Sequence, residues 1–353
     1  MKSLLLHILA GLTCAGLLCA DPKSDPIDFD KARQLIERQR SGEKLTADEQ
    51  AYLDKAKEAR KRSSGNAPAA QRKAPESLNP LCDMTAGDRY EGEDGGLYGG
   101  GKNTPPDALA KSAAAALAQI KPVDGKIAFV SISMSNATME FSFFKRLADA
   151  DARKSAAVTI VDCAQGGQAM AEWVDPAGGP WQVAAQRMEK AGVTPAQVQV
   201  AWIKLANKGP AGSMPDHLTK LENDTLRVLQ NARAKFPNLR IAYLGTRIWA
   251  GNAKGGLNPE PYAYETAFAV RHLIQRQMTG DAALAAEKAP LLLWGPYLWA
   301  EGTKGRKLDD LKWEAGDFTG DGVHPSESGR EKVARRLLDF FTTDPLAKGW
   351  FVK

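Results

Sequence analysis

The sequence predicts an α/β domain with three layers, in which a doubly wound, five-stranded parallel sheet lies between two layers of helices. Three observations lead to this prediction. The chain has 353 residues, of which 43% are hydrophobic, enough to bury a full core in one large domain. From Lys126 onward, apolar segments of strand length alternate with longer segments of helical period. The strand segments are almost continuously apolar, as in parallel sheets covered on both faces.

The expected strands and helices alternate regularly from Lys126 onward. The strand segments are 126–133, 156–164, 198–206, 239–249 and 290–299. The helical segments between them are 139–150, 181–191, 217–236 and 262–279, and a last amphipathic helix over 329–341 closes the fold.

The N-terminal part of the chain differs in composition. Residues 1–20 have one positive charge, an apolar stretch and a small residue at Ala20, which predicts a secretory signal cut after Ala20. A lipoprotein acylated at Cys19 is the second choice, because Leu17 and Leu18 stand where small residues are expected. We therefore expect a secreted or periplasmic protein with no integral membrane segment after signal cleavage.

Two further segments precede the main domain. Residues 21–62 predict a charged helical hairpin, in which Thr46 and Glu49 form a capping box for the second helix. Residues 63–77 have the composition of a linker, so the main domain is expected over residues 78–353. For this hairpin we favour the role of a solvated spacer or docking appendage over a catalytic role.

Charge and cysteine content limit the possible functions. The net charge of +5 is spread along the chain, so no nucleic-acid partner is expected. The mature chain would retain two cysteines, Cys82 and Cys163, which could form a disulfide or remain buried thiols. Their spacing does not decide between these two alternatives.

Polar, glycine-rich or aromatic residues follow every expected strand, where the ligand site of such a sheet lies. Within "DFTGDGVHPSESGREKVA", from Asp317, the first half resembles a calcium loop. The bidentate Glu of such a loop is replaced by Ser328, so no metal is expected. Asp321 instead lies three residues before His324, as a carboxylate that orients an imidazole. Pro325 suits the start of the following helix, and Ser328 with Glu331 predicts its capping box.

A general base needs a nucleophile and donors for an oxyanion. Ser135 follows the first strand directly, whereas Ser131 and Ser133 lie within it. Gly167, with Gly166 as the alternative, offers an unobstructed backbone N–H after the second strand, and the amide of Asn207 follows the third. Each residue alone could be a simple helix cap or turn residue, but their joint placement favours a site. The GxSxG elbow of the ordinary α/β-hydrolases is absent.

These blocks resemble the SGNH (GDSL-like) hydrolases, whose fold is flavodoxin-like. Their Ser, Gly, Asn and D-x-x-H positions correspond in order to Ser135, Gly167, Asn207, and Asp321 with His324. The pattern departs from G-D-S at "SMS", and "LANK" keeps only the Asn of its block. The resemblance spans residues 126–341. The sequence resembles uncharacterised secreted planctomycete-type bacterial members more closely still, with blocks such as "VSISMSN", "AQGGQA", "LNPEPYAYE" and "WGPYLWA".

The resemblance implies a serine esterase that needs no cofactor. Its expected catalytic residues are Ser135, Asp321 and His324, with oxyanion donors on Ser135, Gly167 and Asn207. Arg247, Trp249 and Trp299 could line the pocket, which favours a carbohydrate O-acetyl group or a similar small acyl ester on a small molecule or polysaccharide. The alternatives are a lipase or thioesterase of the same fold, and a non-catalytic carbohydrate-binding protein on this scaffold.

Overall fold

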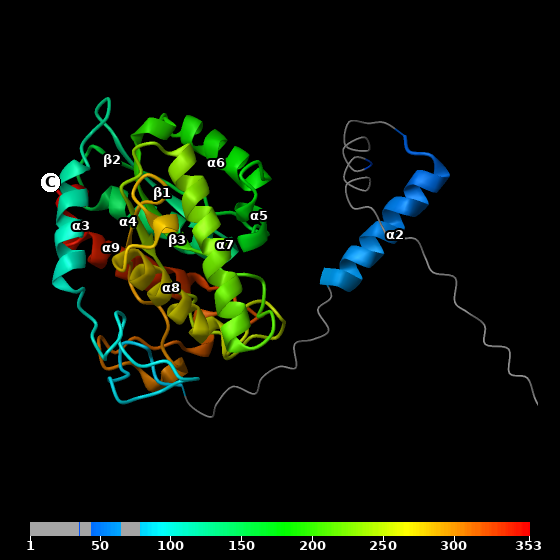
Figure 1. Cartoon of the computed structure of the whole chain (residues 1–353). Helices are drawn as coiled ribbons and strands as arrows, with labels where there is room; N and C mark the ends of the chain where they lie inside the picture. Colours follow the sequence, from blue (N-terminus) through cyan, green and yellow to red (C-terminus); the bar gives the residue numbers. More distant parts are fainter. Residues whose placement is uncertain (1–34, 36–43, 65–77) are drawn as a thin grey trace, which may run out of the picture. The chain divides into compact units, whose positions relative to one another are not determined.

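The computed structural model describes residue 35, residues 44–64 and residues 78–353 (Figure 1). The chain divides into two compact units, Met1–Ala70 and Gln71–Lys353. In the first unit, α2 (Ala47–Ser64) begins with the reciprocal hydrogen bonds expected between Thr46 and Glu49. The predicted signal, the first half of the hairpin and residues 65–77 of the linker lie outside the described residues, so the proposed domain limits stay a prediction.

The second unit contains the predicted five-stranded parallel sheet. Its strand order is β2-β1-β3-β4-β5, and each neighbouring pair is parallel. The strands are β1 (Ile127–Ser133), β2 (Val158–Val161), β3 (Val198–Lys204), β4 (Ile241–Leu244) and β5 (Leu291–Trp294). This is the flavodoxin-like order, in which the strand sequence reverses between β1 and β3. A ligand site is therefore expected beyond the carboxyl ends of these two strands.

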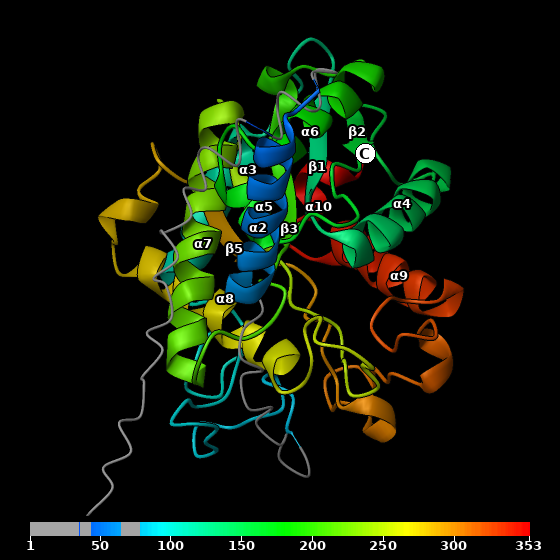
Figure 2. The same cartoon turned by 90° about the vertical axis from the view of Figure 1, so that its right-hand side faces the viewer.

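Helices cover both faces of the sheet, as predicted. The first layer contains α4 (Ser135–Ala150) and α9 (Glu327–Thr343), which pack against each other. Figure 2 shows them on one side of the strands, with α7 and α8 on the other. The second layer contains α5 (Met170–Val174), α6 (Gly179–Lys190), α7 (Met214–Lys235) and α8 (Tyr262–Met278). The remaining helices are α3 (Asp107–Gln119), which lies against β5, α10 (Lys348–Phe351), and the 3₁₀ turns Pro195–Gln197, Ala282–Leu284, Gly302–Lys304 and Ala315–Asp317.

The core is centred on the two strands at the reversal. Every residue of β1 and β3 is buried, which explains why their sequences lack polar alternation. Phe129 of β1 contacts rings from both α4 and α9, with centroid distances of 5.2 Å to Phe141 and 4.8 Å to Phe341. These contacts fix α4 on the sheet, and α4 begins at a residue of the expected site.

Several details differ from the sequence-based expectations. The helix expected over 139–150 begins at Ser135, and the strand expected over 239–249 ends at Leu244. Residues 245–248 are buried in a loop after the strand rather than in the sheet, and Trp249 is half-buried in the same loop. Cys82 and Cys163 are both buried free thiols, so they do not form a disulfide. Among the described helices, none is both long and apolar enough to cross a membrane.

Candidate active site

Ser135 is the first residue of α4, directly beyond the carboxyl end of β1. The N-cap is Met134, whose side chain forms no capping hydrogen bond, and the first helical bond runs from the N–H of Thr138 to the carbonyl of Met134. The N–H of Ser135 belongs to the first helical turn, where backbone donors have no acceptor within the helix. Ser135 therefore presents both a hydroxyl and a backbone donor at the strand end.

The other two serines of this segment are structural. The Ser133 hydroxyl donates to the carbonyl of Lys204 on β3, and the Ser131 hydroxyl donates to Asp162, 2.6 Å away. Both side chains are completely buried, whereas Ser135 is half-buried. Ser135 is thus the serine of this segment that a substrate can reach.

The structure brings Ser135, His324 and Asp321 into one hydrogen-bonded row. The distance from Ser135 Oγ to His324 Nε2 is 2.8 Å, and that from His324 Nδ1 to Asp321 Oδ2 is 2.5 Å. Ser135 comes from the start of α4, and the other two come from the loop before α9. The row joins segments 189 residues apart in the sequence.

The backbone of the loop fixes the Asp321 carboxylate. Its Oδ1 accepts hydrogen bonds from the N–H groups of Val323 and His324 and from the Thr319 hydroxyl, each at 2.9 Å. Burial opposes ionisation of Asp321, but the hydrogen bonds from His324, Val323 and Thr319 outweigh it and lower the pKa of the carboxyl well below its usual range. The Asp321 carboxylate is therefore ionised at neutral pH and can accept the hydrogen bond of His324 as an anion.

One glycine is required for this loop to form. Gly322 has a φ of +72°, and a Cβ at this position would lie 1.8 Å from the carbonyl oxygen of Asn252. Any side chain would therefore displace the loop that carries Asp321 and His324.

The cap of α9 differs from the prediction. Ser326 is the N-cap and accepts from the N–H of Gly329, whereas Ser328 donates to Gly316 and Asp317. The predicted Ser328–Glu331 capping box is wrong, because the helix begins at Glu327 and places Ser328 within its first turn.

Nothing in the loop forms a calcium site. Asp317 binds Ser328 and Lys332, while Asp321 faces His324, so the two carboxylates do not converge on one point. Within the described part of the chain, no group of three or more His, Cys, Asp or Glu side chains is placed to hold a metal ion.

The expected oxyanion donors lie on the loops after β2 and β3. Gly167 is exposed and has a φ of +75°, and a Cβ there would meet no atom within 4 Å. The positive φ explains the glycine at position 167, and Gly166, which has no positive φ, is equally open to a Cβ. Asn207 is half-buried, three residues after the end of β3, and its carbonyl accepts from the side chain of Asn258.

Two of the three expected pocket residues are not accessible. Trp299 is completely buried and donates through Nε1 to Glu260, 2.8 Å away, and Arg247 is 2% exposed. Neither side chain can contact a substrate in this structure, so the prediction that they line the pocket is not supported. Trp249 is half-buried and packs on Phe318, with ring centroids 5.9 Å apart. Trp249 is the one of the three that could border a ligand.

Three residues that shape the site were not predicted from the sequence. Asn136 donates through Nδ2 to the carbonyl of Val323 at 2.8 Å, and it is completely buried. The completely buried pair of Lys204 and Glu140, with Nζ 2.6 Å from Oε1, joins the end of β3 to α4. A charge within an apolar strand segment was the available signal for Lys204, whereas Asn136 and Glu140 lie in a helix with several other polar residues.

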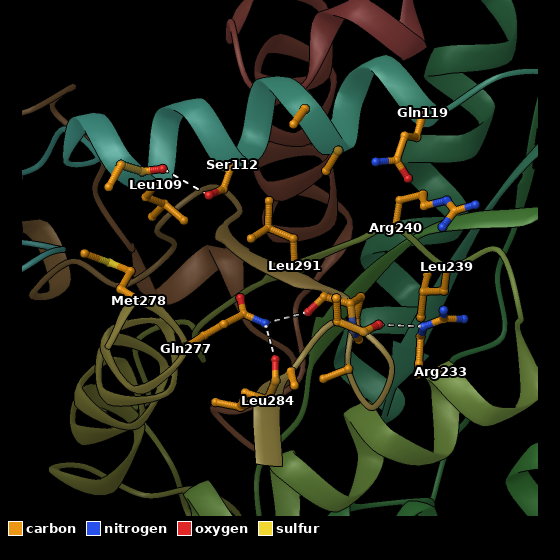
Figure 3. A pocket seen from close by; sticks show the side chains of 17 residues that line it. Leu109, Ser112, Gln119, Arg233, Leu239, Arg240, Gln277, Met278, Leu284 and Leu291 are labelled. Carbon is orange, nitrogen blue, oxygen red and sulfur yellow. Dashed lines mark hydrogen bonds between the residues drawn. The ribbon is translucent and has the colours of Figure 1, made fainter. Parts of the chain in front are cut away.

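A separate cavity of about 530 Å³ lies at the opposite end of the sheet. It is bordered by α3, the end of α8 and the residues at the start of β4 and β5, including Arg240 and Leu291 (Figure 3). These are the amino ends of the strands, so the cavity is distinct from the site around Ser135.

Comparison with known proteins gives matches among solved structures only. No family model matches the chain, and no curated protein matches it. A candidate acylhydrolase from Bacteroides fragilis is 15% identical, with 67% of this chain and 97% of that chain covered and a TM-score of 0.36. A GDSL-like lipase from Bacteroides thetaiotaomicron is 13% identical, with 65% and 95% covered and a TM-score of 0.30.

A third similar structure has a different description. The periplasmic domain of a lipopolysaccharide acetyltransferase from Salmonella ser. Paratyphi A is 12% identical, with 67% of this chain and 94% of that chain covered and a TM-score of 0.36. One of these structures is a GDSL-like lipase, of the hydrolase family that the motif blocks resemble, while the similarity to planctomycete-type proteins stays a prediction. Because these matches are distant, the function proposed below rests on the geometry of the site.

Proposed function

We propose that this protein is a serine ester hydrolase of the SGNH type that acts through an acyl-enzyme on Ser135. The observation that carries the proposal is the hydrogen-bonded row from Ser135 through His324 to Asp321. A half-buried serine, an imidazole within hydrogen-bond reach and an anionic carboxylate behind it form the arrangement that activates a hydroxyl for attack on a carbonyl.

The row accounts for both halves of the reaction. In the first half, Ser135 Oγ attacks the ester carbonyl carbon while His324 Nε2 takes the hydroxyl proton. His324 then returns that proton to the leaving alcohol, so the C–O bond breaks and the acyl group remains on Ser135. In the second half, water attacks the acyl-enzyme by the same route and releases the carboxylic acid. Asp321 holds the His324 tautomer and stabilises the imidazolium.

The negative charge that develops on the carbonyl oxygen needs donors. We assign this role to the N–H groups of Ser135 and Gly167 and to the side-chain amide of Asn207. The first is supported by the uncapped start of α4, and the second by the open surroundings of Gly167. Removal of one such donor typically lowers kcat by roughly a hundredfold to a thousandfold.

The proposed substrate is a small acyl ester, with an O-acetyl group on a carbohydrate as the leading candidate. Ser135 and His324 are both partly exposed, so a group on a larger molecule can reach them. Trp249 supplies a partly accessible aromatic ring after β4, and such rings suit the faces of sugars. The predicted secretory signal agrees with an extracellular polysaccharide as substrate.

Hydrolysis of p-nitrophenyl acetate by the purified protein tests the proposed activity. Wild type and Ser133→Ala should release p-nitrophenolate, although Ser133→Ala loses one buried hydrogen bond, and Ser135→Ala should be inactive. Full activity in Ser135→Ala, with circular dichroism showing that both variants are folded, would rule out the proposed nucleophile.

A further inference from the structure

The segment from residue 250 to residue 261, between β4 and α8, contacts both sides of the proposed site. On one side, the N–H of Lys254 donates to the carbonyl of Asp321 at 3.0 Å. On the other side, Asn258 donates through Nδ2 to the carbonyls of Asn207, at 2.5 Å, and Lys208, at 3.2 Å. The backbone N–H of Asn258 also donates to Lys208, at 2.8 Å. The segment therefore bridges the acid–base loop and the loop that follows β3.

Asn258 is built into this bridge rather than placed on its surface. It is 1% exposed and has a φ of +47°, in the left-handed region that asparagine tolerates better than most residues. The end of the segment is held by Glu260, whose carboxylate accepts from the N–H groups of Ala250 and Tyr264 and from Nε1 of Trp299. Because Asn258 is held in place in this way, its hydrogen bonds fix the position of the peptide groups that it binds.

We propose that Asn258 is a positioning residue that sets the orientation of Asn207, so that the Asn207 amide points at the developing oxyanion. This inference rests on the proposed function. Three hydrogen bonds from one residue fix the main chain at positions 207 and 208. Their geometry determines where the side chain of Asn207 can reach. Asn207 is half-buried on a loop beyond the end of β3, where the sheet no longer constrains the backbone, and it also interacts with the hydroxyl of Tyr262.

Loss of the hydrogen bonds that Asn258 donates should lower kcat rather than change KM. A donor displaced by about 1 Å loses much of its transition-state interaction, and such a misplacement can lower the rate about a hundredfold. Ground-state binding of a small ester depends little on the oxyanion donors, so KM should change much less than kcat.

Two variants remove the clamp in different ways. Asn258→Asp keeps the size of the side chain but replaces the Nδ2 donor with an acceptor, and Asn258→Gly tolerates the positive φ without any side chain. Both should lower kcat for p-nitrophenyl acetate roughly 10- to 100-fold. The matched control is Asn238→Asp, because Asn238 donates a similar bond of 2.7 Å to the carbonyl of Ala196 at the amino ends of the strands. The control should keep the kcat of the wild type.

A double-mutant cycle separates positioning of Asn207 from general damage. If Asn258 acts through Asn207, Asn258→Gly should lower kcat in the wild type but cause no further loss in an Asn207→Ala background. An equal loss in both backgrounds, or wild-type kcat in both Asn258 variants, would overturn the proposal. Full activity in Asn207→Ala would also overturn it, while inactivity of Ser135→Ala would show that the proposed hydrolase mechanism still holds.

Discussion

Asn136 Nδ2 lies 2.8 Å from the carbonyl oxygen of Val323, which joins the helix that begins at Ser135 to the loop that carries His324. The two segments are otherwise distant in sequence, and their separation determines whether Oγ and Nε2 can form a hydrogen bond. Asn136 is completely buried, so water cannot replace this bond when it is lost. The bond therefore links the stability of the fold directly to the geometry of the proposed nucleophile.

Asn136→Ala should lower kcat/KM about tenfold or more, because His324 would no longer be held at hydrogen-bond distance from Ser135. It should also lower the free energy of unfolding by about 1–3 kcal/mol, because the Val323 carbonyl loses its side-chain donor. Asn231→Ala is the control, since Asn231 donates a similar bond of 2.9 Å to Val174 away from the site. Equal activity in the two variants would contradict the role assigned to Asn136.

Asp321→Asn should reduce kcat by about 10⁴, because an amide no longer fixes the tautomer of His324 or stabilises its cation. The side chain is about half exposed, so the fold should tolerate the change. Steady-state kinetics with p-nitrophenyl acetate and a denaturation curve measure the two quantities. A loss smaller than about tenfold would show that Asp321 does not orient the general base.

Glu140→Gln should destabilise the protein by about 3–5 kcal/mol, because it leaves Lys204 buried without its carboxylate partner. Burial already lowers the pKa of Lys204 to about 8 despite the presence of Glu140. Asp149→Asn on the same helix is the control, because Asp149 is exposed and pairs with the exposed Lys145 and, at 3.5 Å, with Lys154, and such surface pairs contribute about 0–1 kcal/mol. Urea denaturation should separate the two variants clearly, and similar midpoints would refute the importance of the buried pair.

His272 should make stability depend on pH. Burial opposes its charge, but the hydrogen bonds that His272 donates to the carboxylates of Glu222 and Glu93 outweigh burial and raise the pKa of His272 to about 9. A raised pKa in the folded state favours folding while the unfolded chain remains protonated, below about 6.5. This contribution, of the order of 1–3 kcal/mol, is lost as the pH rises from about 6.5 to 9.

The His272→Gln variant tests this contribution. Its free energy of unfolding should be lower than that of wild type at pH 6, and the two should converge near pH 9. Urea denaturation at several pH values measures the difference. A difference that stays constant over this range would contradict the assigned ion pairs of His272 with Glu93 and Glu222.

The sequence predicted the sheet because each buried strand carries a continuous apolar segment, and it predicted the His324–Asp321 pair because the two residues are close in sequence. Other features depend on contacts that sequence does not specify. Trp299 could have faced a ligand or the core, and only the packing of the loop after β5 places it against Glu260. Both Ser326 and Ser328 are suitable N-cap residues, and the structure shows Ser326 as the N-cap because α9 begins at Glu327.

One helix, α3, and one hydrogen bond, that from Asn258 to Asn207, could not be predicted from hydrophobic periodicity. The apolar positions of α3 are almost all alanine, so they form no clear stripe, although alanine has the highest helix propensity. Asn258 lies 51 residues from Asn207 in a loop without regular periodicity, so their hydrogen bond could be found only in three dimensions.

The central claim is that Ser135 is the nucleophile activated by His324, and covalent labelling tests it most directly. The protein is treated with diisopropyl fluorophosphate, in which a serine oxygen displaces fluoride from phosphorus, and the modified peptide is identified by mass spectrometry. We expect one adduct on Ser135, no adduct in Ser135→Ala and much slower labelling in His324→Gln. An adduct on Ser133, or ester hydrolysis by a protein whose Ser135 is never labelled, would contradict the account.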